Sequence, residues 1–157
     1  MVEQGVYLDT HPSARARGRR FSDDGAVSIQ LEAGPAAAAV ARNALVPMAR
    51  EVDEDLMADV RLLVSELVTN SVRHADMPPP RQVNVEVSLD SGKIHVEVED
   101  TGSGFKPRPR RHAQSKAGGW GLYLVERLAD RWGVVCNNLT RVWFEIDRGR
   151  PSGATAA

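Results

Sequence analysis

The sequence predicts an α+β fold, a two-layer α/β sandwich in which helices cover one face of a mostly antiparallel sheet. Three observations carry this prediction. Short segments alternate apolar and polar residues with the period of two that is typical of strands. Longer segments repeat apolar residues at steps of three and four, as helices do. The order along the chain is strand, helix, helix, strand, strand, loop, helix, strand, strand, and for this order an antiparallel sheet with helices on one side is the economical packing.

The first strand and the first helix lie close together in the chain. Residues 26–33 alternate apolar and polar side chains, which predicts a half-buried strand. Pro35 suits a first helical turn, so a helix is expected over residues 36 to about 50. Pro47 should kink or end that helix, because proline lacks the backbone N–H that the helix needs.

A second helix is predicted over residues 55–74, with Asp53 or Asp55 as its N-cap. Apolar residues recur there at helical spacing, and a proline run ends the pattern. The later strands, joined first by a hairpin turn and then by a loop and a helix, complete the fold. In chain order we predict a strand at 83–89, a strand at 94–100, a loop at 101–117, a helix at 119–132, and strands at 134–137 and 140–147.

The 157 residues are enough for one domain with its own core, which we place at residues 26–147. Residues 1–25 lack hydrophobic periodicity and hold four arginines between positions 15 and 20. We expect this basic extension to be disordered, with docking on an acidic partner as the alternative. Residues 148–157 are expected to form a disordered tail.

Composition limits the class of protein. A net charge of −1 argues against direct binding of nucleic acid or of an anionic membrane surface. No apolar run is long enough to cross a bilayer, and no charged segment followed by an apolar stretch opens the chain, so we expect no secretory signal. Cys136 is the single cysteine, which excludes an internal disulfide and a cysteine-based zinc site. These observations predict a cytoplasmic protein.

Asp100 is the most informative single residue. It shares the strand parity of Val96 and Val98, so its side chain should face the core. A buried carboxylate is costly unless it is hydrogen-bonded, and an adenine amino group would donate where a guanine presents an acceptor. The alternative is that strand pairing ends earlier and the carboxylate caps the following turn. Gly102 and Gly104 favour a ligand, because glycine lets the backbone approach it closely.

Glu66, Asn70 and either Arg73 or His74 share one face of the second helix, beside its apolar stripe. A carboxylate and a carboxamide at this spacing suit a Mg²⁺ ion that keeps most of its water and bridges phosphates. The carboxylate would also accept a proton from an attacking hydroxyl group. A solvent-exposed polar flank is the alternative for this face. His74, at the helix end, suits capping of carbonyl groups better than chemistry.

Gly118, Gly119 and Gly121 open the third predicted helix. The free N–H groups of a helix N-terminus bind anions, and glycines remove side chains that would block a phosphate. Simple helix packing is the alternative. The preceding loop is basic from Lys106 to Lys116. Either the loop closes over a triphosphate as a lid, or it is an exposed loop that its charge keeps soluble.

Two residues of the last strand complete the candidates. Thr140 has the parity of the inward-facing residues of that strand and would reach the edge of a base from the side opposite Asp100. Trp143 falls on the other face, either as a surface residue or as the anchor of an interface.

With these residues in place, the chain resembles the GHKL ATPase superfamily, whose members include gyrase, the heat-shock chaperone ATPases and histidine kinases. Residues 66–75 resemble its N box, residues 100–105 its first glycine box and residues 118–122 its second. The resemblance covers residues 26–147 and is nearest to the bacterial anti-sigma-factor serine kinases. The two segments that resemble this branch most specifically are Glu66-Leu-Val-Thr-Asn-Ser-Val-Arg-His-Ala and Leu128-Ala-Asp-Arg-Trp-Gly-Val.

That resemblance implies a histidine-kinase-like ATPase fold that binds ATP and Mg²⁺. It implies that Glu66 is the general base, that Asn70 holds Mg²⁺ and that Asp100 takes the adenine amino group. Thr140 would help to hold the base, and Trp120 stands at a variable position without a separate role. The implied nucleotide-binding set is Asn70, Arg73, Ala75, Asp100, Gly102, Gly104, Phe105, Gly118, Gly119, Trp120, Gly121, Leu122 and Thr140.

The resemblance also implies partners. Such proteins bind a sigma factor and phosphorylate a serine or threonine of an anti-sigma-factor antagonist. The alternative is a nucleotide-gated module that sequesters a partner without turnover; Glu66, which a pure binder would not need, favours the kinase. A histidine kinase is disfavoured, because no phosphoacceptor helix precedes the N box. The sequence leaves open whether the chain forms a homodimer.

Overall fold

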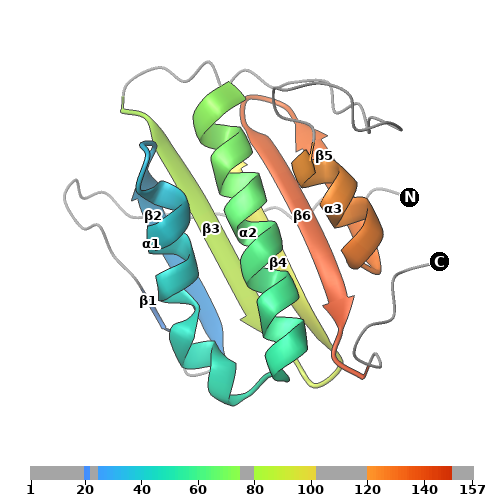
Figure 1. Ribbon diagram of the computed structural model, residues 1–157. Helices are drawn as coiled ribbons and strands as arrows, with labels where there is room; N and C mark the ends of the chain where they lie inside the picture. The colour runs from blue at the N-terminus through green and yellow to red at the C-terminus, as the bar shows by residue number, and fades with distance from the viewer. Residues whose placement is uncertain (1–19, 22–24, 75–79, 102–119, 150–157) are drawn as a thin grey trace.

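A computed structural model of the chain describes residues 20–21, 25–74, 80–101 and 120–149. These residues form two layers, a six-stranded sheet and a layer of helices on one of its faces (Figure 1). The strand order is β1-β2-β3-β4-β6-β5, and every pair is antiparallel. The elements are β1 (Arg20–Phe21), β2 (Ala26–Glu32), α1 (Ala37–Ala44), the 3₁₀ turn η1 (Val46–Arg50), α2 (Glu54–His74), β3 (Gln82–Leu89), β4 (Lys93–Asp100), α3 (Trp120–Leu128), β5 (Arg131–Cys136) and β6 (Thr140–Asp147).

The predicted α+β sandwich is confirmed, and local sequence signals account for most of its elements. Asp53 accepts hydrogen bonds from the N–H groups of Asp55 and Leu56, at 3.1 and 3.3 Å, and so caps the start of α2. Asp90 accepts the N–H groups of Gly92 and Lys93, both at 2.8 Å, and closes the turn between β3 and β4. These bonds hold the pKa of the Asp90 carboxyl below its usual value.

Several boundaries differ from the sequence prediction, and β5 spans Arg131–Cys136 instead of residues 134–137. The first helix ends at Ala44 and continues as the 3₁₀ turn, because Pro47 in its first turn cannot donate the bond that an α-helix needs. The third helix ends at Leu128, since Trp132 pairs with Phe144 in the sheet instead of extending the helix. Pairing with β2 begins at Arg20–Phe21, within the extension predicted to be disordered.

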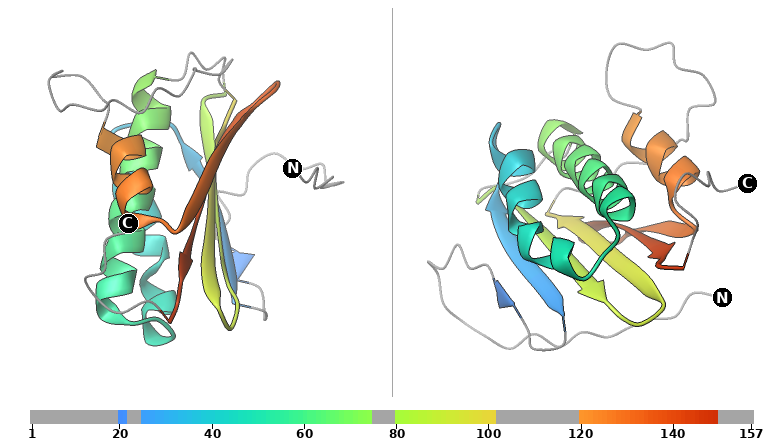
Figure 2. Two further views of the ribbon diagram at one scale, coloured as in Figure 1. Left: turned by 90° about the vertical axis from the view of Figure 1, so that its right-hand side faces the viewer. Right: turned by 60° about the horizontal axis from the view of Figure 1, so that its bottom comes forward.

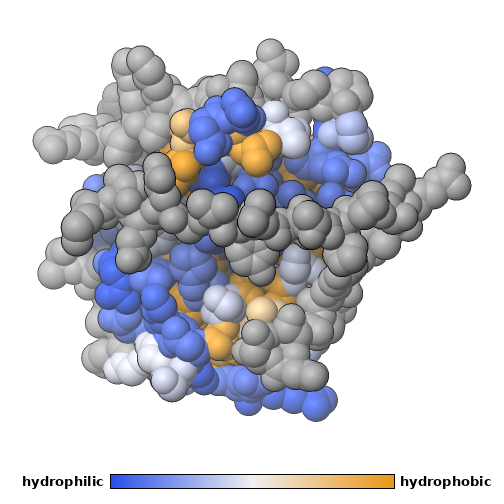
Figure 3. All heavy atoms as spheres, turned by 180° about the vertical axis from the view of Figure 1, so that it is seen from behind, coloured by the Kyte–Doolittle hydropathy of each residue, from blue (hydrophilic) through white to orange (hydrophobic). Residues whose placement is uncertain are grey.

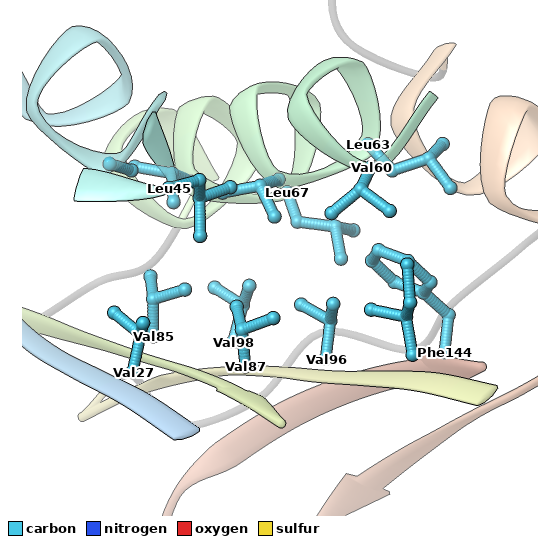
Figure 4. Close-up of a cluster of buried hydrophobic side chains, with 14 of the residues drawn as sticks. Val27, Leu45, Val60, Leu63, Leu67, Val85, Val87, Val96, Val98 and Phe144 are labelled. Atoms are coloured by element: carbon cyan, nitrogen blue, oxygen red, sulfur yellow. The ribbon is translucent and has the colours of Figure 1, made fainter. Parts of the chain in front are cut away.

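The core lies between the two layers. Along β3 and β4 the inward positions are buried, and α2 places its apolar stripe over them (Figure 4). Burying a Val or Leu side chain contributes roughly 1.5–3 kcal/mol, so this contact dominates the stability of the fold. The largest fully buried side chains include Leu45, Val60, Leu63, Val64, Val68, Val85, Val87, Ile94, Phe144 and Ile146. None of the described helices is both long and apolar enough to cross a membrane.

The opposite face of the sheet carries no helix among the described residues (Figure 2), and hydrophilic side chains cover much of it (Figure 3). Glu145 of β6 accepts bonds there from Lys93, His95 and Arg131, at 2.5, 3.1 and 2.7 Å. Burial alone would raise the pKa of Glu145, but these three hydrogen bonds lower it to about 2. The ion pairs therefore join β4, β6 and β5 at neutral pH.

Trp143 spans the same three strands. Its indole lies across Gly133 of β5, where an added Cβ would come within 2.7 Å of Nε1. It also stacks on His95 of β4, with ring centroids 5.9 Å apart and an angle of 22° between the planes. Trp143 therefore packs over Gly133, where the edge strand β5 has no side chain. Its role as the anchor of an interface stays a prediction.

His95 predicts a pH dependence of stability. Its two ring nitrogens lie 3.0 Å from Glu97 and 3.1 Å from Glu145, and only the imidazolium form donates from both. The bond to Glu97, with that to Glu145, raises the pKa of His95 above its ordinary 6.5, although burial opposes the shift. The stabilisation is therefore present below pH 6.5 and is lost as the pH rises through the raised pKa.

We expect the free energy of unfolding to fall by less than about 1 kcal/mol across that window, because the ring is partly exposed and solvent screens the pairs. Urea denaturation of the wild type and of His95→Gln at pH 6, 7 and 8 measures it. The variant should show a flatter dependence on pH. An identical slope in the two proteins would assign the pH dependence to other groups.

Candidate functional site

The candidate site begins where the apolar inner face of the sheet ends. Asp100 is the last residue of β4 and Thr140 the first of β6, and the two pair in register. Asp100 is 4% exposed and Thr140 is 2% exposed, so both side chains lie on the buried side of the sheet, as their strand parity predicted. The next pair on the same face of the sheet is the apolar Val98 and Val142. A carboxylate and a hydroxyl group thus close an otherwise apolar surface.

Helix α2 carries the second part of the site. Glu66 and Asn70 stand one turn apart and are half-buried, while Arg73 is exposed near the helix end. Leu67 and Val68, which lie between the two polar residues in sequence, are at most 2% exposed and belong to the core. Because Leu67 and Val68 are fixed in the core, the helix backbone that carries Glu66 and Asn70 is fixed as well.

Helix α3 meets α2 at this point. A Cβ built on Gly121 would lie 2.1 Å from Nδ2 and 3.1 Å from Cγ of Asn70, and 3.5 Å from the backbone oxygen of Glu66. The second glycine segment and the N-box segment, distant in sequence, are therefore in direct contact. Leu122, the next residue of α3, is 6% exposed and packs in the core.

The elements that carry these residues converge at one end of the molecule. The C-terminal end of α2, the end of β4, the start of β6 and the start of α3 lie together at the top of Figure 1, and both views of Figure 2 agree. Sequence reasoning predicted this grouping of Asp100, Thr140, Asn70 and Gly121. The roles assigned to these four residues remain predictions.

Several predicted residues lie outside the part of the chain that the structure describes. They include the basic segment at positions 106–116, and the side chains of His74 and Trp120 are likewise not described, although both residues belong to helices. The lid hypothesis for the basic segment therefore stays a prediction. The site residues outside the described ranges are Ala75, Gly102, Gly104, Phe105, Gly118 and Gly119.

Two features of the site were missed from the sequence. The Oγ1 atom of Thr101, which directly follows Asp100, is buried and has no hydrogen-bond partner among the described residues. Its position after Asp100 was the available signal. The second feature is a bond of 3.0 Å from Nη1 of Arg42 on α1 to Oγ of Ser65, beside Glu66. Ser65 in turn donates to the backbone oxygen of Arg61, and no local pattern announces this link between the two helices.

The described residues hold no cluster of side chains that could bind a metal ion by itself. In the described ranges, no three residues among histidine, cysteine, aspartate and glutamate lie close enough together to hold a metal ion. An ion at this site would therefore need oxygen atoms from a bound ligand and from water in addition to those of the protein.

Comparison with known proteins agrees with this arrangement. The family model for the histidine kinase-like ATPase domain matches residues 30–145, which is most of the chain. The chain therefore belongs to the histidine kinase-like ATPase family, as the sequence resemblance predicted.

Named relatives narrow the resemblance. Serine-protein kinase RsbW of Listeria innocua is 29% identical over 118 residues, which are 66% of this chain and 75% of that protein. Anti-sigma F factor of Clostridium botulinum is 32% identical over 75 residues, 46% of this chain and 52% of that protein. Both relatives belong with the anti-sigma-factor kinase branch, which the sequence motifs resembled.

Proposed function

We propose that this chain binds Mg-ATP and acts as an anti-sigma-factor-like regulator, a protein serine/threonine kinase that phosphorylates an anti-sigma-factor antagonist. The observation that carries the proposal is the buried pair of Asp100 and Thr140, where the apolar inner face of the sheet ends. Family membership and relatives named as a serine-protein kinase and an anti-sigma factor support it. A regulator of this kind would act in the cytoplasm. It would bind a sigma factor at one time and the anti-sigma-factor antagonist at another.

Three local features fit an adenine nucleotide. The carboxylate of Asp100 accepts hydrogen bonds only, which matches an adenine amino group and disfavours the guanine oxygen. The buried hydroxyl group of Thr101 lacks a partner among the described residues, and a ligand or its bound water would supply one. At Gly121 the absence of a side chain lets α3 lie directly against Asn70, the residue proposed to contact Mg²⁺.

The residues would divide the work as follows. Asp100 and Thr140 would orient the base, while the amide oxygen of Asn70 would contact Mg²⁺. When bound, ATP would supply the phosphoryl group, and Mg²⁺ would neutralise the charge of the phosphate oxygens. Glu66 would accept the proton of the partner's serine or threonine hydroxyl group at a carboxylate oxygen. The alternative, a binding module without turnover, needs Asp100 and Asn70 but not Glu66.

Asp100→Asn tests the adenine assignment. The substitution keeps the shape but replaces part of the acceptor capacity with a donor that opposes the adenine amino group. Losing a charge-assisted bond at a buried position should weaken ADP binding by about 1.5–3 kcal/mol. Calorimetry with ADP and GDP measures this, with Asp147→Asn on the exposed outer face as the control. Equal affinity of the wild type for the two nucleotides would remove the assignment.

Asn70→Ala tests the metal role. We expect weaker nucleotide binding in Mg²⁺ and nearly unchanged binding in EDTA, because the carboxamide oxygen would contact the ion and not the base. Parallel nucleotide titrations in the two buffers separate a contact with the ion from a contact with the base. Asn84→Ala, a half-buried asparagine on the outer face of β3, is the control. Equal losses in Mg²⁺ and EDTA would make Asn70 a structural residue.

Glu66→Gln separates the kinase from the binding module. The change is nearly isosteric, so stability and Mg-ATP affinity should hold. Phosphate transfer to a co-purified antagonist protein should fall roughly 10²–10⁴-fold, because a carboxamide cannot accept the proton. Labelled ATP measures the transfer, and Glu126→Gln on the exposed side of α3 is the matched control. No transfer by the wild type to any bound partner would favour the binding module, and equal transfer by Glu66→Gln would require another base.

A further inference from the structure

The contact between Gly121 and Asn70 carries an inference of its own. A Cβ at position 121 would lie 2.1 Å from Nδ2 of Asn70, far inside the 3.0 Å that real Cβ atoms essentially never cross. A side chain at position 121 and the present carboxamide position of Asn70 therefore exclude each other. The two residues come from different helices, so only the packing of α3 on α2 creates this exclusion.

The usual reasons for a glycine do not apply at this position. Gly25 is the glycine with a positive φ among the described residues, whereas Gly121 lies in the first turn of α3 with helical backbone. Glycine is a poor helix former, so the backbone gains nothing from it there. A steric reason remains, and the nearest atoms to the missing side chain are those of Asn70.

Asn70 is also the group that would yield to a side chain at position 121. The atom in the way is the far end of a side chain, whereas the nearest backbone atom, the oxygen of Glu66, is at an ordinary contact distance of 3.5 Å. The backbone of α2 is fixed by Leu67 and Val68, which are at most 2% exposed. An added methyl group should therefore turn the carboxamide away and leave both helices in place.

We propose that Gly121 is a positioning residue whose missing side chain is the space that holds the carboxamide of Asn70. The amide nitrogen faces Gly121, and the amide oxygen lies farther from it. That oxygen is the atom that would meet Mg²⁺ in the proposed function, on which this inference rests. Gly121 thus acts on the metal through Asn70, and not through an approach of its own backbone to a phosphate.

The first experiment needs no ligand. In Gly121→Ala the side-chain amide signals of Asn70, identified in nitrogen-15 spectra by their loss in Asn70→Ala, should shift. The thermal midpoint of unfolding should hold or rise, because alanine favours the helix. Gly34→Ala, which adds the same methyl group in open space, should leave the Asn70 signals unchanged.

The second experiment is a rescue measured by nucleotide affinity. In Mg²⁺, Gly121→Ala should bind ADP roughly tenfold to a hundredfold more weakly, the range seen when the support of a metal ligand is lost. In EDTA its affinity should match the wild type. The double variant Asn70→Ala/Gly121→Ala should bind no more weakly than Asn70→Ala, because truncation of the carboxamide makes room for the new methyl group.

The two experiments separate this inference from the proposed function. If the wild type binds no adenine nucleotide, the proposed function fails, while the Asn70 signals still decide the role of Gly121. Unchanged Asn70 signals in Gly121→Ala would overturn the inference, and so would additive losses in the double variant. A thermal midpoint well below that of Gly34→Ala would also overturn it, because α3 itself would then have moved.

Discussion

The seating of α2 on the inner face of the sheet sets the position of each polar group at the candidate site. Val60, Val64 and Val68 are completely buried in this contact, and each contributes roughly 1.5–3 kcal/mol. By comparison, the single hydrogen bond from the charged Arg42 to Ser65 contributes about 1.5–3 kcal/mol, no more than one of these valines. Packing therefore decides where the helix lies. Glu66 and Asn70 take their places as a consequence, because they flank the stripe that packing fixes.

The inner face of the sheet changes from apolar to polar at the end of β4 and the start of β6. Strand parity carries an apolar row along β4 and β6 up to Val98 and Val142, and the next pair is Asp100 and Thr140. A carboxylate and a hydroxyl group thus end the apolar row at the place where the predicted site lies. On the outer face Glu145 is also buried, at 8% exposed, and Lys93, His95 and Arg131 compensate its charge and join the strands.

Patterns within short segments predicted much of the fold, and contacts between distant segments could not be predicted in this way. The alternation in β4 placed Asp100 inward, and the helical spacing in α2 grouped Glu66 with Asn70. The boundary at Trp132 was wrong, because pairing with Phe144 outweighs the local helical pattern. The stacking of Trp143 on His95 depends on the pairing of β4 with β6, two strands that are distant in sequence and joined by no hairpin turn. The exclusion between Gly121 and Asn70 depends likewise on how two helices pack.

In the proposed function, the buried end of β4 and β6 receives an adenine base while Asn70 faces the metal. A crystal structure of the chain with Mg²⁺ and a non-hydrolysable ATP analogue tests this claim most directly. We expect the adenine amino group within hydrogen-bond distance of the Asp100 carboxylate and the amide oxygen of Asn70 among the ligands of the ion. A base bound elsewhere, or an Asn70 side chain turned away from the ion, would contradict it.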